Sequence, residues 1–347
     1  MQRFQKIIIA LGVITVLVIV FSIISSYFVR PNQKTQLSAV IPDINGGESE
    51  KLLDDQKNNY VIAAWIWKYP EDILKDFDNM IKFAKKEDIN TLYVYIDNYV
   101  DIYELPESAE KIEKMNKYEN SLQGVVQKAK KENISVQALS GFTAYSYDSH
   151  SYIPPIVVDH VFEFNQKHPN DKLDGIQFDI EFYEDSRFFG SQEEYVQSYL
   201  QLVSDMAKRV KNLNDQYQDN VQLGFVIPFW FDEVNEYLSK PIIKNLVTDL
   251  SVAQHPYLVI MAYRNIIEGD KGVLEISGSE LQAANNTPVK IIIAQELVEN
   301  KDTKITHFGE SRVDIKKAFL KIIEGAKSNP SFAGISIHDL ETFMKTK

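Results

Sequence analysis

The sequence predicts an α/β protein, a (β/α)8 TIM barrel preceded by one N-terminal transmembrane helix. Three observations support this prediction: the length of the chain, an uncharged apolar run near its start, and alternating strand and helix patterns over residues 60–347. The chain has 347 residues, of which 44% are hydrophobic and 25% charged, as in globular proteins. Barrels of this class form one domain of about 250 residues, so residues 60–347 fit a single barrel domain.

The apolar run near the N-terminus spans Ile7–Val29 and contains neither charge nor proline. At a rise of about 1.5 Å per residue, a helix of this length crosses a hydrocarbon core of roughly 30 Å. No A-x-A site closes the run, so we expect an uncleaved signal anchor, with signal cleavage as the alternative. We therefore expect residues 1–6 in the cytoplasm, the lipid bilayer as a partner, and a single-pass cell-membrane protein with its C-terminal domain outside the cytoplasm.

Residues 30–59 join this run to the predicted barrel. They are polar, include proline and glycine, and show little periodicity. The pattern indicates a tether between membrane and domain, with an ordered arm packed on the barrel as the alternative.

Eight short apolar runs rich in Val, Ile, Tyr and Phe follow, as is typical of strands. The runs are Val61–Trp67, Asn90–Ile96, Ile134–Leu139, Gly175–Glu181, Val221–Pro228, Tyr257–Tyr263, Val289–Gln295 and Ala333–His338. Amphipathic helical patterns lie between them, for example at Glu194–Leu213 and Asp314–Ala326. Such alternation predicts a parallel sheet covered by helices.

An open, doubly wound sheet fits the same alternation, but no G-x-G-x-x-G follows the first strand. Polar residues instead occur near the carboxyl ends of many strands, where a barrel forms one mouth. These residues are Lys68, Asp97, Glu181, Tyr263, Gln295 and His338. We therefore favour the closed barrel.

Charge and cysteine content exclude several kinds of site. The formal net charge is −12, which argues against a nucleic-acid partner because phosphate binding needs a basic face. The chain has no cysteine, which excludes disulfides, thiolate metal sites and a cysteine nucleophile. Its six histidines lack metal-ligand spacing, so we expect no metal and no cofactor, although a site built from distant histidines stays open.

The fourth predicted strand, in "LDGIQFDIEFYED", carries a polar residue at every second position. Gln177, Asp179 and Glu181 therefore share one face, which points inward in a barrel. Two carboxylates about 6–7 Å apart along a strand raise each other's pKa. A carboxyl that stays protonated near neutral pH can protonate a leaving-group oxygen, as glycoside hydrolysis requires. The alternative is a polar cluster inside the barrel that holds no ligand.

"DGIQFDIEFY" resembles the fourth-strand signature of glycoside hydrolase family 18, the chitinases and endo-β-N-acetylglucosaminidases, D-G-x-D-x-D-x-E. The resemblance implies that Glu181 is the general acid/base and that Asp179 orients the acetamido group of the substrate, whose oxygen is the nucleophile. "VIMAYR" resembles the sixth strand of that family. By the same resemblance Met261 and Tyr263 line the sugar site, with Tyr263 as a catalytic hydrogen-bond donor to the acetamido oxygen.

The sequence departs from the family pattern at three positions. Gln177 replaces the middle Asp, Arg264 stands where many members have Asp, and His338 occurs where a tryptophan is expected. Gln177 can still donate a hydrogen bond to Asp179, but it cannot take up a charge as Asp does. The departures indicate a divergent member, or a separate barrel glycosidase family with the same strand-four acid.

Further residues near the strand ends are suited to a sugar, because flat rings with polar rims match pyranose CH faces and hydroxyls. The residues expected to contact substrate are Gln177, Met261, Trp65, Trp67, Asp97, Tyr145, Trp230, Arg264, Gln295, Glu296 and His338. Asp97, Glu296 and Asp339 are also candidates for a second carboxylate in a conventional mechanism.

These observations lead to the expectation of a membrane-anchored, extracytoplasmic glycoside hydrolase. Its expected partner is a cell-wall or extracellular polysaccharide that contains N-acetylated sugars. Two alternatives stay open: a catalytically inactive, carbohydrate-binding barrel, and a structural partner in envelope assembly.

Overall fold

The computed structural model describes residues 60–147, 150–236 and 241–347. The expected cytoplasmic tail (1–6), signal anchor (7–29) and tether (30–59) lie outside the described residues. Within the described ranges, none of the helices combines the length and the apolar character needed to span a bilayer.

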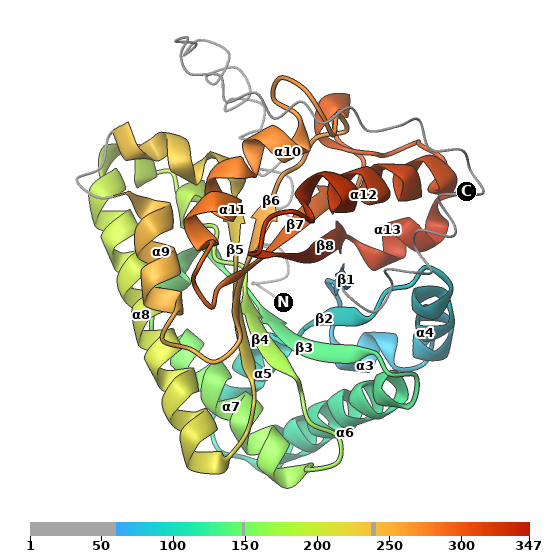
Figure 1. Ribbon diagram of the computed structural model, residues 1–347. Coiled ribbons are helices and arrows are strands. Elements are labelled where there is room, and N and C mark those ends of the chain that lie inside the picture. The colour runs from blue at the N-terminus through green and yellow to red at the C-terminus, as the bar shows by residue number, and fades with distance from the viewer. Residues whose placement is uncertain (1–59, 148–149, 237–240) are drawn as a thin grey trace.

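Eight parallel strands form a closed barrel in the order β1-β2-β3-β4-β5-β6-β7-β8 (Figure 1). The strands are β1 (Val61–Ile66), β2 (Thr91–Tyr95), β3 (Ser135–Ser140), β4 (Gly175–Phe178), β5 (Gln222–Pro228), β6 (Pro256–Met261), β7 (Lys290–Glu296) and β8 (Phe332–His338). Pairing of β8 with β1, for example Ile335 beside Ile62, closes the barrel. The predicted (β/α)8 barrel is therefore confirmed, and the open sheet is excluded.

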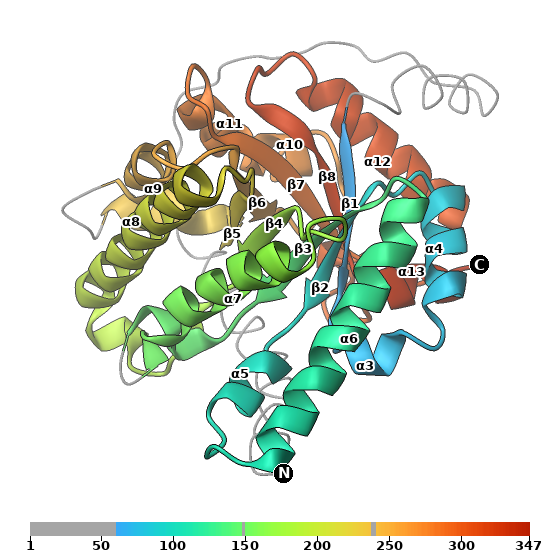
Figure 2. The same cartoon turned by 90° about the horizontal axis from the view of Figure 1, so that it is seen from below.

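Helices surround the strands on the outside, as the view from below shows (Figure 2). They are α3 (Pro70–Ile73), α4 (Phe77–Lys86), α5 (Asn98–Tyr103), α6 (Ala109–Lys131), α7 (Ile153–Lys167), α8 (Gln192–Tyr217), α9 (Ile242–Leu250), α10 (Val273–Ile276), α11 (Gly278–Ala284), α12 (Arg312–Ala326) and α13 (Leu340–Lys345). Short 3₁₀ turns lie between them: η1 (Thr143–Ser146), η3 (Phe182–Glu184), η4 (Phe188–Gly190), η5 (Phe229–Glu236) and η6 (Thr303–Ile305). Serine side chains cap two of the longer helices, with Ser108 accepting from Lys111 N and Ser311 from Asp314 N.

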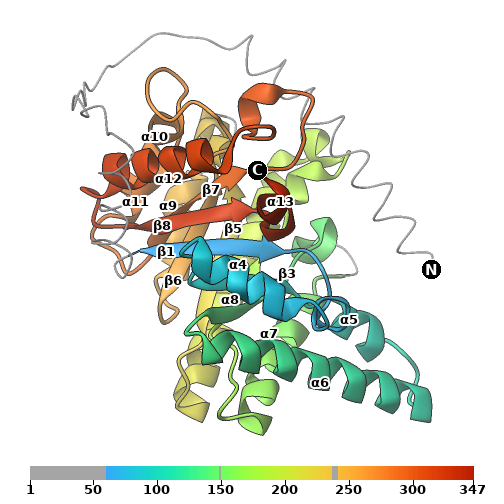
Figure 3. The same ribbon diagram turned by 90° about the vertical axis from the view of Figure 1, so that its right-hand side faces the viewer.

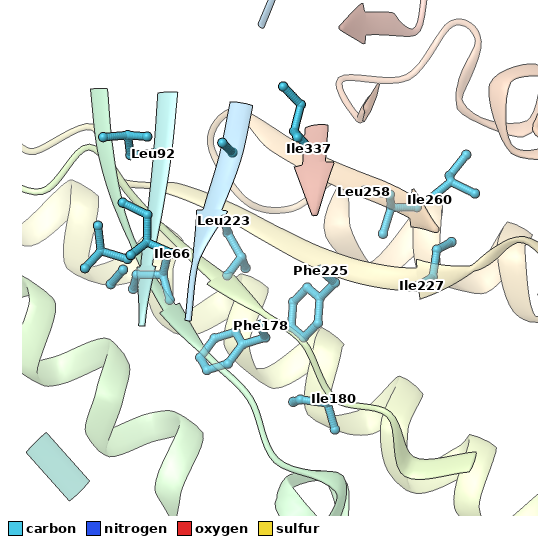
Figure 4. Close-up of a cluster of buried hydrophobic side chains, with 14 of the residues drawn as sticks. Ile66, Leu92, Phe178, Ile180, Leu223, Phe225, Ile227, Leu258, Ile260 and Ile337 are labelled. Carbon is cyan, nitrogen blue, oxygen red and sulfur yellow. The ribbon is translucent and has the colours of Figure 1, made fainter. Parts of the chain in front are cut away.

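The main apolar core lies between the strands and the helices (Figure 4). Outward-facing residues of adjacent strands pack there, such as Phe178 of β4 against Phe225 of β5, with ring centroids 5.4 Å apart. Ile176 and Ile180, which alternate with the polar residues of the fourth strand, also belong to this layer. Burying apolar surface stabilises the fold by roughly 25 cal/mol per Å², so this layer supplies most of the driving force.

A second, smaller cluster fills the inside of the barrel, as expected for this fold. Three of its nine buried members are aromatic, here called the aromatic cluster: the Trp65 and Tyr93 rings lie 5.8 Å apart, and Tyr93 stacks on Tyr257 at 6.3 Å. Strands β1 and β8 point the same way, and α13 follows at the carboxyl end of β8 (Figure 3). That end of the barrel is the mouth, and the aromatic cluster lies below it.

The fourth strand is shorter than predicted. It ends at Phe178, although Asp179 N still donates to Ser140 O at 2.9 Å. Glu181, with φ −85° and ψ 60°, begins η3 instead of continuing the strand. This turn directs Phe182 into the outer core, where its ring centroid lies 4.7 Å from that of Tyr199. Phe182 thus stays on the outward side with Ile176, Phe178 and Ile180, although the strand has already ended.

Gly224 makes room for Tyr257 inside the barrel, because a Cβ at this position would lie 2.1 Å from the tyrosine ring. Gly224→Ala should lower the free energy of unfolding by about 1–3 kcal/mol through overpacking, as measured by urea unfolding. Gly190→Ala is the matched control, since nothing lies within 4 Å of its Cβ. Equal stability of the two variants would contradict close packing at Gly224.

Candidate active site

Asp179 and Glu181, here called the carboxyl pair, lie at the mouth where β4 ends, and both are partly buried. Gly141, directly after β3, holds the chain close to this point, because a Cβ there would lie 2.3 Å from Asp179 O. The position of the pair is therefore set by backbone contact between β3 and β4.

Burial raises the pKa of both carboxyls, since a charged carboxylate loses solvation at this position. The Glu181 charge raises the pKa of Asp179 further, so that it lies well above its usual range. Two coupled carboxyls lose their protons in separate steps. Between these steps the pair holds one proton and one negative charge, and the Glu181 charge together with the hydrogen bond from Tyr183 to Glu181 favours the proton on Asp179.

The two members of the pair differ in their hydrogen bonds. Tyr183 Oη donates to Glu181 Oε1 at 3.0 Å, and the Tyr183 ring in turn meets Trp230 edge-on at 4.9 Å. Asp179 accepts no hydrogen bond from the described residues, and its Oδ1 is buried. The carboxylate of Asp179 therefore has acceptor capacity that no protein donor in the described ranges uses.

Tyr263 completes this part of the mouth. Burial raises its pKa well above the usual range, and the charges of Glu296, Asp179 and Glu181 act in the same direction. Its ring also stacks near His338, with centroids 6.2 Å apart. The structure thus brings Asp179, Glu181 and Tyr263 together, although the sequence places Tyr263 two strands away.

His338 occupies the end of β8 and contacts several predicted site residues. Its Nδ1 lies 3.0 Å from both carboxylate oxygens of Glu296, and its ring meets Trp65 at 5.7 Å and Trp67 at 6.1 Å. Burial disfavours the charged imidazolium, but the Glu296 carboxylate outweighs this effect and raises the pKa of His338 to about 9. The site therefore contains a cation at neutral pH.

The three candidates for a second carboxylate are each engaged elsewhere. Asp97 is buried and accepts from Tyr145 Oη at 2.9 Å and from Gly141 N at 3.2 Å. Glu296 holds His338, and Asp339 caps α13 by accepting from Thr342 N at 2.8 Å. Burial raises the pKa of Asp97 to about 6, partly offset by its hydrogen bonds. Unlike these three acids, Asp179 has no protein donor among the described residues.

Gln177 belongs to a neutral hydrogen-bond network inside the barrel, and its hydrogen bonds go to residues other than Asp179. Its Oε1 accepts from Trp65 Nε1 at 2.5 Å, and its Nε2 donates to Tyr257 Oη at 3.2 Å. Tyr257 Oη donates onward to Gln137 Oε1 at 2.6 Å. Gln177 lies one layer below Asp179, beside the aromatic cluster, and its amide oxygen and nitrogen each have a partner there.

The remaining predicted contacts differ in how they face the mouth. Trp67 is partly buried beside Tyr95, and its indole N–H has no hydrogen-bond partner among the described residues. Trp65 is 1% exposed and lies deeper in the barrel. Met261 is partly exposed at the end of β6. Arg264 donates from Nη1 to Tyr263 O at 2.8 Å, with its guanidinium 4.7 Å from the Phe229 ring centroid.

Gln295 lies apart from this group. It is fully buried, and its Nε2 donates to the backbone oxygens of Ala262 and Ala294, both at 2.8 Å. His307 Nε2 lies 3.1 Å from its Oε1. Neighbours on a strand face opposite ways, so Gln295 and Glu296 cannot both point into the barrel.

Two residues near the pair were not predicted. Tyr183 contacts Glu181 directly, and continued alternation through Asp179 and Glu181 would have indicated it. Glu184, the last residue of η3, is partly buried, and burial together with the Glu181 charge raises its pKa to about 7. Only the turn at Glu181 brings Glu184 near the pair, so the strand pattern contained no signal for it. No group of three His, Cys, Asp or Glu in the described ranges is arranged to hold a metal.

Comparison with solved structures relates this geometry to known barrels. A β-mannanase from the blue mussel Mytilus edulis has a TM-score of 0.51 and 12% identity, with 82% of this chain and 90% of the mannanase covered. A glycoside hydrolase family 18 chitinase from Pseudoalteromonas aurantia has a TM-score of 0.50 and 11% identity, with 80% and 93% covered. The fold is that of the glycoside hydrolase barrels.

A cell-surface-expressed, multi-modular chitinase from a Paenibacillus species also matches, with a TM-score of 0.51 and 12% identity. The match covers 83% of this chain and 43% of that enzyme. No protein-family model matches the sequence, and no curated protein matches it. At such identities the likeness shows a shared fold, and the low identity agrees with a divergent barrel.

The neutral network predicts how the barrel responds to a charge. Gln177→Glu should lower the free energy of unfolding by about 2–4 kcal/mol near pH 8, because it buries a carboxylate. Burial raises the folded-state pKa of the new Glu, so stability falls as pH rises above its unfolded value of about 4.3. The loss should therefore be smaller near pH 5, as urea unfolding at both pH values would show.

Gln222→Glu is the control for this change. Gln222 is partly exposed and ends the same network, where its Oε1 accepts from Gln137 Nε2 at 3.2 Å. The free energy of unfolding of Gln222→Glu should fall by less than about 1 kcal/mol at either pH. A pH-independent loss in Gln177→Glu would show that its cost is steric.

Proposed function

We propose that the protein is a glycoside hydrolase in which Glu181 is the general acid/base. The observation that carries the proposal is the carboxyl pair: two adjacent, partly buried acids at the mouth of a barrel, with raised pKa values. The raised pKa values keep a proton on the pair near neutral pH, and an acetamido N–H donated to Asp179 would favour that proton on Glu181, next to the leaving-group oxygen. The shared fold with the mannanase and the family 18 chitinase supports the reaction class.

We further propose that the substrate carries a 2-acetamido group. Glu181 protonates the glycosidic oxygen while the acetamido oxygen attacks the anomeric carbon, and the bond to the leaving sugar breaks. Asp179 accepts the acetamido N–H and stabilises the positive charge of the cyclised intermediate. Water, deprotonated by Glu181, then opens the intermediate. The unpartnered Asp179 oxygen and the engagement of Asp97, Glu296 and Asp339 support this path.

The neighbouring aromatic groups fit a sugar in this position. Trp67 offers an indole N–H, Tyr263 a hydroxyl near the pair, and Trp230 a ring beside Tyr183. Rings with polar rims bind both the CH faces and the hydroxyls of pyranoses. We propose Tyr263 as the donor to the acetamido oxygen.

The proposed place of action is the cell surface. An apolar, uncharged run of this length at Ile7–Val29 supports membrane anchoring, with the barrel outside the cytoplasm. A cell-wall or extracellular polysaccharide with N-acetylated sugars is then the substrate within reach.

A second candidate function is carbohydrate binding without hydrolysis. Gln177 and His338 favour it, because both depart from the family 18 pattern inside the site. A glycan array paired with a hydrolysis screen separates the two functions. Binding with no cleavage of any bound glycan, at high protein concentration, would favour the binding barrel.

Glu181→Gln should reduce kcat by at least about 10³-fold on any glycan that the wild type cleaves, because the acid is lost while the shape is kept. The thermal midpoint should stay within a few degrees of the wild type. Glu341→Gln is the control, since Glu341 pairs with Lys68 at 2.6 Å on α13 at the same end of the barrel. Turnover like that of the wild type in Glu181→Gln would remove Glu181 from the mechanism.

Asp179→Asn keeps the side-chain shape and removes the charge. Its kcat should fall roughly 10²-fold or more, with little change in substrate affinity, because the charge acts mainly on the transition state. A thiazoline analogue of N-acetylglucosamine should inhibit the wild type, since it mimics the cyclised intermediate. Efficient cleavage of a glycan with a plain 2-hydroxyl would exclude acetamido participation while leaving Glu181 as the acid.

A further inference from the structure

We propose that His338 is a positioning residue whose imidazolium, held by Glu296, lets the carboxyl pair carry one negative charge inside the barrel. The proposal rests on the proposed function, because the charge matters only if Asp179 must be ionised while Glu181 keeps a proton. It assigns a role to the residue that stands where the resembled family has a tryptophan.

The geometry fixes the imidazole in one orientation. Nδ1 lies 3.0 Å from Glu296 Oε1 and 3.0 Å from Oε2, so this nitrogen donates to the carboxylate. Glu296 also accepts from Val298 N at 2.7 Å, which holds the carboxylate in place. The His338 side chain is 25% exposed, compared with 11% for Glu296, and Nε2 makes no hydrogen bond to the described residues. The ring thus borders the mouth while its partner lies behind it.

Aromatic rings restrict His338 on several sides. Trp65 and Trp67 meet it edge-on, at interplanar angles of 71° and 73°, and Tyr263 lies nearly parallel at 28°. The same rings keep water away, which strengthens the attraction between His338 and the nearby acids.

The other titratable groups around the pair are acids and tyrosines, whereas His338 carries a positive charge. Asp179 and Glu181 interact electrostatically, and Tyr183 donates to Glu181. Glu184 lies within electrostatic range of Glu181, and the hydroxyls of Tyr199 and Tyr263 lie within electrostatic range of the pair. In the described part of the chain, His338 is the cation whose charge lowers the pKa of both carboxyls. On its other side His338 faces Glu296 and Asp339.

No protein hydrogen bond replaces this charge at Asp179. Gln177, which could have donated, is committed to Trp65 and Tyr257. Asp179 Oδ1 has no donor among the described residues. Without the imidazolium, burial would hold both protons on the pair to higher pH, and Asp179 would meet the substrate uncharged.

The sign of the effect follows from linkage. A cation near the pair favours its singly deprotonated form, so the first proton leaves at lower pH than it otherwise would. Neutralising position 338 should therefore move the first dissociation of the pair to higher pH by roughly one unit. The acid limb of kcat/KM should move in the same direction, since it reports this dissociation in the free enzyme.

The experiment is a ¹³C NMR titration of Asp and Glu side-chain carboxyls in the full chain, with Asp179→Asn and Glu181→Gln used for assignment. His338→Asn and Glu296→Gln should both raise the pKa of the first dissociation of the pair. His338→Lys should return this pKa to its wild-type value, because the positive charge returns. His255→Asn is the control, since His255 is exposed directly before β6, at the opposite end of the barrel. Thermal unfolding checks that each variant is folded.

An unchanged pKa of the first dissociation in folded His338→Asn or Glu296→Gln would overturn the proposal. A His338→Lys variant that does not return this pKa to the wild-type value would overturn it too. The activity arm is separate. On a glycan that the wild type cleaves, kcat/KM of His338→Asn should be roughly 10-fold lower than that of the wild type at pH values below the shifted acid limb. It should recover at higher pH, with KM little changed. If the wild type cleaves no glycan, the proposed function fails, while the titration still decides the role of His338.

Discussion

Burial of two adjacent carboxyls at the end of β4 is the constraint on which the rest of the site depends. Taking a carboxylate out of water costs several kcal/mol, and a second charge beside it adds to that cost. The barrel meets this constraint at Asp179 and Glu181 by keeping a proton on the pair, by a tyrosine donor at Glu181, and by one imidazolium across the mouth. The chemistry we propose uses the state that results, with one proton and one charge.

The layer below the pair explains why Gln177 is tolerated. A carboxylic acid at this position would add a third ionisable group to the interior, next to Trp65, Tyr257 and Gln137. The amide instead accepts one hydrogen bond and donates another without carrying charge. The neutral network and the aromatic cluster thus form a floor for the pair, and Gly224 provides the space that Tyr257 needs.

Much of the fold could be predicted from the sequence because each strand has its own apolar pattern and the outer face is strongly apolar. The position of Asp179 and Glu181 followed from a period of two along one strand. What could not be predicted depends on contacts between distant segments: Asp97 with Tyr145, His338 with Glu296, and Gln177 with Tyr257. Local pattern has no information on which partner a buried polar group will meet.

Two differences have a local physical cause. The strand pattern ran through Glu181, but the strand ends at Phe178, and the turn that begins at Glu181 brings Glu184 toward the pair. Gln295 ends an apolar run as the other candidates do, yet it faces outward because Glu296 faces the mouth.

The most direct test of the central claim is the anomeric form of the first sugar released, measured by ¹H NMR before mutarotation. Acetamido participation with Asp179 and Glu181 predicts retention of configuration, and inversion would contradict it.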